Sequence, residues 1–356
     1  MLFGMSKNLV GLDIGDSSIK AVELKDMGRG RGFQLLNLAF EPLSSEAIVD
    51  GAIMDSGLVI ETLQRLFRNN RIQTTQVATA LSGHSVIIKR IPLPVMTQEE
   101  LAESIQWEAE QYIPFEIEDV NVDYQILEGS SLSGEGNMDV LLVAVKKEKI
   151  NDYVSVITQA GLTPAVVDID AFALQNAFEA NYETEAGQVV ALIDIGAAVT
   201  TITMMHGGTS VFWRDINIGG NQYTDSIQKE FNVSAEQSER LKRGEEVAGT
   251  SANAVIPILS SVTEDLGGEI QKTIDFFKAT TSTDEPLEKI YLTGGTSQLV
   301  NLKEALGERF GAPVEVLNPF RKISSAKRSL PPDLLHRMSS TAAVAVGLAL
   351  RKAGDK

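Results

Sequence analysis

The chain contains no cysteine, and this absence excludes several kinds of chemistry at once. Without thiols there can be no disulfide, no thiolate nucleophile and no zinc site with cysteine ligands. The three histidines, His84, His206 and His336, lie far apart in the sequence, so a histidine metal site or a serine–histidine–aspartate triad has little support. Thiol and histidine chemistry are therefore both disfavoured.

Positive charge is scarce as well, because 31 lysines and arginines stand against 48 aspartates and glutamates, a net charge of −17. Nucleic-acid binding needs a basic face, and we interpret the small basic group Lys322, Lys327 and Arg328 as a solvated loop. The apolar residues 342–350 are fewer than the roughly 20 that span a bilayer, and residues 1–5 are too few for a signal peptide. The sequence predicts a cytoplasmic protein that reaches the inner membrane only through a partner.

The length of 356 residues allows two or three domains, each with its own core. Three strands are expected within residues 8–42, and a similar set of three begins again within residues 189–216. The strand–helix pattern is interrupted at Gln76 and resumes near Ala165, while residues 183–187 are typical of a domain junction. The sequence therefore predicts two similar halves, with an insertion in the first.

A short pattern occurs in both halves: residues 12–15 read LDIG and residues 192–196 read LIDIG. Small hydroxyl-rich residues and a second apolar run follow each copy, which predicts a β-hairpin whose Asp ends the first strand and whose Gly opens the turn. Backbone N–H groups and hydroxyls in such turns can close around a phosphate. An ordinary turn explains one copy equally well. Two copies half a chain apart indicate two half-molecules that hold one triphosphate.

A third motif, residues 291–297 (YLTGGTS), follows an apolar strand and precedes a helix expected at residues 298–310. A strand, a Gly-Gly turn and a helix N-terminus let the backbone approach a flat or anionic ligand closely. This arrangement supports a nucleotide site.

The most regular expected helix spans residues 97–113 and begins with a capping box of Thr97 and Glu100. Trp107 points well over 90° away from the face that carries Leu101 and Ile105. Two interpretations stay open. Trp107 either packs under the neighbouring Pro114–Phe115 loop or faces a partner as an anchor, a role that aromatic residues often take at interfaces.

The order of these motifs resembles that of the actin/Hsp70/FtsA ATPase superfamily. The order comprises the two DIG hairpins, residues 218–220 (IGG), Glu239-x-x-Lys242, residues 292–295 (LTGG) and a small-residue helix at 339–351. Residues 104–123 (SIQWEAEQYIPFEIEDVNVD) and 168–175 (DIDAFALQ) resemble the PilM family of type IV pilus assembly proteins. The resemblance covers nearly the whole chain.

The resemblance implies an α/β, actin-like ATPase fold: two ribonuclease-H-like lobes around a nucleotide cleft, with a small FtsA-like α/β subdomain inserted in the first. The first lobe (1A) would comprise residues 7–75, 164–185 and the C-terminal helix 339–352. The partner-binding insert (1C) would comprise residues 76–163, and the second lobe (2A/2B) residues 186–338.

ATP and Mg²⁺ are the ligands that the resemblance implies. Asp13 and Asp194 would face each other and hold the metal through water, which suits Mg²⁺ because it keeps several waters. Lys20 would neutralise phosphate charge as a point cation. The nucleotide-binding set implied is Gly15, Asp16, Ser17, Ser18, Lys20, Gly196, Thr200, Thr201, Gly219, Gly220, Glu239, Lys242, Gly294, Gly295 and Gln298.

The roles of several of these residues stay open. Glu239 and Lys242 would contact ribose and base, or form an exposed ion pair on one helix. Asp16 stands where actin-like proteins usually carry Ser, Thr or Gly, and a carboxylate near the γ-phosphate is unfavourable unless it turns away or meets the metal. The pair Ala197-Ala198 leaves few donors in the second turn.

Hydrolysis needs a group that orients water in line with the γ-phosphate. Asp170 is the nearest catalytic candidate and Asp168 a weaker one, while both could simply cap the end of a strand. We therefore predict nucleotide binding with weak or no ATPase activity.

The resemblance also implies a partner, PilN, a bitopic inner-membrane protein whose short cytoplasmic N-terminal tail docks in a groove by the insert. The candidate contacts are Trp107, Tyr112, Pro114 and Phe115. Pilus ATPases and the platform protein are further candidate partners. Two alternatives remain: an FtsA-like division protein, although residues 339–351 do not form its usual basic amphipathic helix, and a small-molecule kinase, although no polar acceptor cluster is visible.

Overall fold

The computed structural model describes residues 8–28, 30–127, 136–247, 249–281, 285–325, 335 and 338–355. The predictions for residues 1–5, Lys327, Arg328 and His336 lie outside these ranges. No helix in this part of the chain is both long enough and apolar enough to cross a membrane.

The first lobe is built on a six-stranded sheet of order β10-β6-β1-β2-β3-β16. The strands β1, β2 and β3 run antiparallel, whereas β6 and β10 join the other side of β1 in parallel. The strand bounds are Val10–Ile14 (β1), Ser18–Asp26 (β2), Phe33–Pro42 (β3), Gln76–Leu81 (β6), Thr163–Ile169 (β10) and Ser324–Ser325 (β16).

The second lobe repeats this plan in a five-stranded sheet of order β13-β12-β11-β14-β15. Again three antiparallel strands are followed, on the other side of the first strand, by two parallel ones. The two similar halves predicted from the sequence are thus present. The bounds are Val189–Ile195 (β11), Thr200–His206 (β12), Thr209–Ile216 (β13), Leu287–Thr293 (β14) and Val314–Val316 (β15).

Four helices cover the first sheet: α1 (Ser56–Asn69), α3 (Lys147–Gln159), α4 (Asp170–Asn181) and α10 (Ala343–Ala349). The helix predicted at residues 339–351 is confirmed but shorter. Each residue of α10 is buried, and the helix passes so close to α4 that a Cβ on Gly347 would lie 1.7 Å from the Ala173 carbonyl oxygen. A glycine is required there for the two helices to pack.

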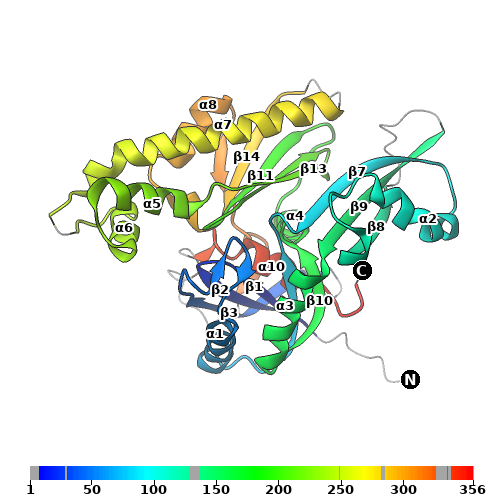
Figure 1. Ribbon diagram of the computed structural model, residues 1–356, viewed down its shortest axis with the longest axis horizontal. Helices are drawn as coiled ribbons and strands as arrows, with labels where there is room; N and C mark the ends of the chain where they lie inside the picture. Colours follow the sequence, from blue (N-terminus) through cyan, green and yellow to red (C-terminus); the bar gives the residue numbers. More distant parts are fainter. Residues whose placement is uncertain are drawn as a thin grey trace.

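The long helix α7 (Ile256–Thr281) lies along the second sheet (Figure 1). A smaller group of elements stands at the far end of this lobe: α5 (Gly220–Phe231), α6 (Ala235–Lys242) and η2 (Ala252–Val255). The prediction of a helix at residues 298–310 is wrong at its start. The turn leads into the 3₁₀ helix η3 (Gly295–Gln298), and α8 (Leu302–Phe310) begins only after Leu299, which is extended, and Asn301, whose φ is 63°.

The insert carries a separate three-stranded sheet of order β7-β9-β8, with its own apolar core, beside the lobes (Figure 1). Its elements are β7 (Val86–Pro94), α2 (Gln98–Glu110), η1 (Ile117–Asp119), β8 (Val120–Leu127) and β9 (Asn137–Lys146). Two elements within the proposed limits of the insert, 76–163, also contact the first lobe. Strand β6 pairs with β1 and β10, and α3 contributes Tyr153, Val156 and Ile157 to the core of the first lobe. The short hairpin β4 (Ile48–Val49) and β5 (Ala52–Ile53) also belongs to that lobe.

Candidate functional site

The two DIG segments form hairpins of the same geometry. Asp13 pairs with Lys20 across the first hairpin, and Asp194 pairs with Thr201 at the equivalent position of the second. The turns close in the same way, because the N–H of Gly15 donates to the Ser18 carbonyl at 3.1 Å and that of Gly196 to the Val199 carbonyl at 3.0 Å. The predicted hairpins, with Asp at the strand end and Gly opening the turn, are confirmed.

A lysine joins the carboxylates of the cleft. Lys20 Nζ lies 3.1 Å from Asp13 Oδ2, and both side chains are mostly buried. Burial would lower the pKa of Lys20, but the carboxylates of Asp13, then Asp194 and Asp170, outweigh this effect and raise the pKa above its ordinary value. The three aspartates therefore share one electrostatic environment with one lysine between them.

Two of these aspartates resist ionisation in the free protein. Burial, followed by the charge of Asp13, raises the pKa of Asp194 to about 7, and Lys20 acts in the opposite direction. Burial and Asp13 likewise raise the pKa of Asp170 to about 7, against a hydrogen bond from the side chain of Ser82. A cation bound beside these carboxyls would favour their charged forms and lower both pKa values.

Asp16 turns away from the first turn. Its Oδ1 accepts a hydrogen bond of 2.9 Å from the N–H of Gly51, in the β4–β5 turn. Burial raises its pKa, although this hydrogen bond and Lys149 act in the opposite direction. This carboxylate therefore has a hydrogen-bond partner outside the first turn.

The second hairpin uses its hydroxyls internally. Thr200 Oγ1 donates to the Ile218 carbonyl at 2.6 Å, and Thr201 Oγ1 donates to Asp215 Oδ1 at 2.7 Å. The first turn of α5 packs against the same hairpin, because the N–H of Gly220 donates to the Gly196 carbonyl at 2.9 Å. Gly219 and Gly220 are therefore at a helix N-terminus beside the hairpin, as predicted. They also allow the start of α5 to pack closely against the turn of the hairpin.

The Gly-Gly turn lies directly against the second aspartate. Gly294 has a φ of 87°, and a Cβ on it would lie 2.7 Å from Asp194 Oδ1. Gly295 is exposed, and a Cβ on it would lie 3.9 Å from Thr341 Cγ2. Gln298 Nε2 donates to Ser340 Oγ at 2.6 Å. The turn thus lies beside Asp194, and Gln298 points to the segment that leads into α10.

Glu239 and Lys242 are not an exposed ion pair. Lys242 is mostly buried, and its Nζ donates to the Gly220 carbonyl at 3.1 Å and to Thr224 Oγ1 at 2.9 Å as well as to Glu239. The pair therefore fastens α6 to the first turn of α5.

The two candidate catalytic aspartates, Asp168 and Asp170, have different surroundings. Asp168 Oδ1 accepts from the N–H of Ile169 at 2.8 Å, and its Oδ2 lies 3.4 Å from Arg351 Nε, so Asp168 caps its strand and holds the C-terminal segment. Asp170, by contrast, belongs to the group formed by Asp13 and Asp194.

The sequence analysis did not identify two residues at this site, Lys149 and Asp215. Lys149, at the start of α3, donates from Nζ to the Ser82 carbonyl at 2.6 Å, and it interacts with Asp170, Asp16 and Asp215. Asp215, at the end of β13, accepts at Oδ2 from the N–H of Gly83 at 2.6 Å. A charged residue directly after the insert and an aspartate at a strand end were the only signals in the sequence.

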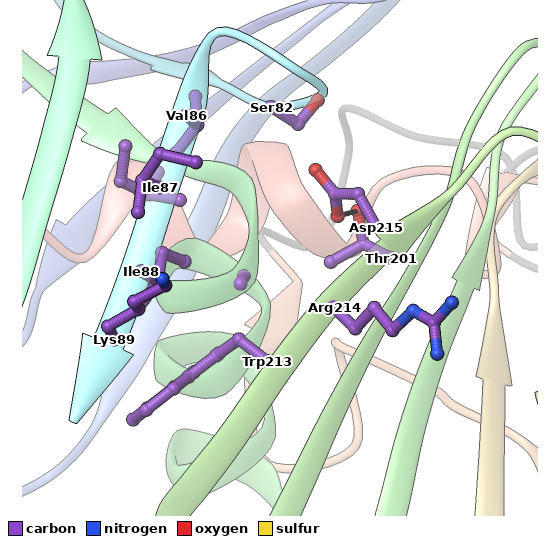
Figure 2. A pocket seen from close by; sticks show the side chains of 11 residues that line it. Ser82, Val86, Ile87, Ile88, Lys89, Thr201, Trp213, Arg214 and Asp215 are labelled. Atoms are coloured by element: carbon purple, nitrogen blue, oxygen red, sulfur yellow. Dashed lines mark hydrogen bonds between the residues drawn. The ribbon is translucent and has the colours of Figure 1, made fainter. Parts of the chain in front are cut away.

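A cavity of about 170 Å³ adjoins these residues, between the edge strands β7 and β13 (Figure 2). Trp213 reaches across it from β13, and Ile87 and Ile88 lie on the other side (Figure 2). Ser82, Thr201 and Asp215 form its polar end. The insert, the first lobe and the second lobe thus meet at one place.

The donor set limits the kind of metal that the cleft can hold. Among the residues that the structure describes, no three His, Asp or Glu side chains form a ready metal cluster. A cation held here would take most of its ligands from water or phosphate. Mg²⁺ fits this requirement, because it binds through one or two carboxylates and keeps waters.

Comparison with known proteins decides the family. A family model described as type IV pilus assembly protein PilM matches residues 11–353. The chain belongs to the PilM family. It also matches a chain of a PilM–PilN type IV pilus biogenesis complex, with 29% identity, a TM-score of 0.86, and coverage of 98% of this chain and 99% of that one.

Two more distant structures share the fold alone. The ethanolamine utilization protein EutJ from Carboxydothermus hydrogenoformans is 16% identical, with a TM-score of 0.57 and coverage of 98% and 93%. MreB5 of Spiroplasma citri, bound to ADP, is 14% identical, with a TM-score of 0.54 and coverage of 96% and 94%. These likenesses confirm the predicted actin-like ATPase fold, and PilM membership disfavours both the FtsA-like and the kinase alternatives.

The insert of this PilM-family chain presents one large aromatic side chain to solvent. Trp107 is 73% exposed on α2, so the interpretation that it packs under the following loop is wrong. Pro114 is exposed too, whereas Tyr112 and Phe115 pack against the core of the insert. Of the four predicted partner contacts, Trp107 and Pro114 are thus available at the surface.

Proposed function

We propose that this PilM-family protein holds ATP with Mg²⁺ between its two lobes and binds the cytoplasmic N-terminal tail of PilN through its insert. The observation that carries the nucleotide half is the pair of matching hairpins whose aspartates share Lys20. The similar MreB5 structure was solved with ADP, and the similar PilM chain belongs to a complex with PilN. The tail would hold this protein at the cytoplasmic face of the inner membrane.

The residues divide into three groups around the nucleotide. Asp13 and Asp194 would hold the hydrated metal, which would offset the charge of the polyphosphate when bound. The phosphates would be bound by Gly15, Ser17, Ser18, Lys20, Gly196, Thr200, Thr201, Gly219 and Gly220. The nucleoside would lie near Glu239, Lys242, Gly294, Gly295 and Gln298.

Slow turnover agrees with the same geometry. The hydroxyls of Thr200 and Thr201 donate within the protein, and Asp16 is turned toward Gly51. Asp170 is the carboxyl best placed to orient water, because it shares the environment of Asp13 and Asp194. We propose a binding protein with weak or no ATPase activity, for which pilus ATPases and the platform protein stay further candidate partners.

Calorimetric titration of the purified chain tests this function directly. We expect ATP to bind with micromolar affinity when Mg²⁺ is present, and a synthetic PilN tail peptide to bind independently of a membrane. A peptide of the same composition in scrambled order is the control. Absence of ATP binding overturns the nucleotide half of the proposal, and equal binding of both peptides overturns the partner half.

Trp107 provides a sharper test of the surface. We expect Trp107→Ala to weaken tail binding by about 10- to 30-fold, since an exposed aromatic anchor contributes much of an interface's free energy. Val95→Ala is the matched control, because Val95 is also apolar, 68% exposed and part of the insert. If both variants bind the tail with wild-type affinity, the tail docks elsewhere on the insert.

A further inference from the structure

Both stems of the insert are attached to the cleft. The first stem, residues 82–85, leaves β6, and the second, residues 146–149, returns into α3. They contact each other, because the N–H of Lys146 donates to the Ser85 carbonyl at 3.0 Å and Lys149 Nζ donates to the Ser82 carbonyl at 2.6 Å. Any change at Lys149 therefore acts on both stems.

The first stem is also fastened to the second lobe. Asp215 Oδ2 accepts from the N–H of Gly83 at 2.6 Å, and Asn217 Nδ2 lies 2.5 Å from His84 Nε2. The other oxygen of Asp215 accepts from Thr201, which stands opposite Asp194 in the second hairpin. One carboxylate thus bridges a hairpin of the nucleotide cleft and the base of the insert.

Lys149 has the surroundings of a phosphate-binding cation. It is largely enclosed, it interacts with Asp170, Asp16 and Asp215, and its hydrogen bond goes to a neutral carbonyl. A terminal phosphate that enters among Asp13, Asp170 and Asp194 brings more negative charge than a carbonyl dipole. A charge-assisted hydrogen bond to that phosphate is about twice as strong as one to a neutral acceptor.

We propose that the stems form a nucleotide-responsive junction, in which Lys149 binds the terminal phosphate of ATP and Asp215 transmits the change between the second hairpin and the insert. This inference rests on the proposed nucleotide function. Contact with the terminal phosphate draws Lys149 away from the Ser82 carbonyl and loosens the tie between the stems. ADP lacks the γ-phosphate, so the hydrogen bond between Lys149 and the Ser82 carbonyl stays in place.

The two tryptophans make the junction observable. Trp213 lines the cavity beside Asp215 (Figure 2). Trp107 is exposed on α2 of the insert. The chain has only these two, so in a Trp107→Phe protein the fluorescence reports Trp213 alone. We expect the ATP analogue AMPPNP with Mg²⁺ to shift the emission of Trp213, and ADP with Mg²⁺ to leave it unchanged.

Lys149→Met and Asp215→Asn test the two roles separately. We expect the Lys149→Met protein to show no fluorescence shift. The ratio of its affinities for AMPPNP and ADP should be about tenfold smaller than in wild type, because one hydrogen bond to a charged group is lost. Asn at 215 can still accept from Thr201 but cannot accept a second N–H at its amide nitrogen. We expect Asp215→Asn to lose the fluorescence shift and the change that AMPPNP causes in tail affinity.

The controls separate this inference from the proposed function. Lys25→Gln and Asp265→Asn remove the same charges at exposed positions and should behave as wild type. Lys149→Arg, which keeps the cation, should restore the shift, and Lys149→Gln replaces the methionine variant if circular dichroism shows that it does not fold. If the wild-type protein binds neither nucleotide nor the PilN tail peptide, the proposed function is contradicted. If the wild-type protein binds both, but the Lys149→Met and Asp215→Asn proteins keep the fluorescence shift and the preference for AMPPNP, only the proposal of a nucleotide-responsive junction is overturned.

Discussion

The Asp194→Asn protein should bind ATP·Mg²⁺ at least about 100-fold more weakly than wild type. One oxygen of the site loses its charge, and a carboxylate near a bound divalent cation contributes more than an ordinary hydrogen bond. The Gly-Gly turn packs against this side chain, and asparagine keeps the shape that the turn needs. The loss should therefore appear in the metal-dependent part of the affinity, so Mg²⁺-free ATP should bind both proteins almost equally.

The same substitution should stabilise the free protein at alkaline pH. The pKa of Asp194 is raised to about 7 in the folded state, above its ordinary 3.8. Between these two values the folded protein keeps a proton that the unfolded chain has lost, so the free energy of unfolding falls as the pH rises through this window. Asparagine cannot ionise, and we expect it to raise that free energy by about 1–2 kcal/mol at pH 8, where Lys20 and solvent screen part of the charge.

Urea unfolding of both proteins at pH 5 and pH 8, with nucleotide absent, measures this second effect. The exposed variant Asp265→Asn should change neither the stability nor the affinity for ATP. A variant with weaker ATP binding and a higher free energy of unfolding would show that Asp194 serves ligand binding rather than the stability of the fold. A variant with wild-type ATP affinity would contradict the metal role.

The hairpins were predictable because the signal is local. Asp13 and Gly15, like Asp194 and Gly196, are two residues apart, and a strand end followed by a turn fixes their relation. Helical spacing likewise predicted that Trp107 points away from the buried face of Leu101 and Ile105. It did not decide whether the side chain packs under the following loop or is exposed, and the structure shows that it is exposed. In each case the predictable part depends on residues within a few positions of one another.

Lys149 and Asp215 were missed because only the fold brings them together. They lie 66 positions apart in the numbering, and they meet at the stem of the insert, which no sequence pattern marks. The contacts that β6 and α3 make with the first lobe also depend on the fold. The strand β6 and the helix α3 read like any strand and helix, and only their pairing with β1 and packing in the core of the first lobe assign them.

The second large effect is expected at a position that touches no ligand. Gly347→Ala should lower the free energy of unfolding by about 3–5 kcal/mol, because overpacking of a close backbone contact is among the few mechanisms that reach such values. An alanine Cβ would stand 1.7 Å from the carbonyl oxygen of Ala173. The helix α10 would have to move away from α4, yet its other side is held equally closely, since a Cβ on Gly11 would lie 2.0 Å from the Ala345 carbonyl oxygen.

A shift of α10 should reach the cleft as well. The carbonyl of Ser340, just before the helix, accepts from the N–H of Gly294 at 2.7 Å and from Thr293 Oγ1 at 2.6 Å. We therefore expect Gly347→Ala to weaken ATP binding even at temperatures where it stays folded. Gly268→Ala, in α7, is the matched control, since its Cβ would make an ordinary van der Waals contact with Arg309 Nη2, 3.9 Å away. That variant should gain up to about 1 kcal/mol from helix propensity, and a Gly347→Ala protein with equal stability would show that α10 can separate from α4 without loss.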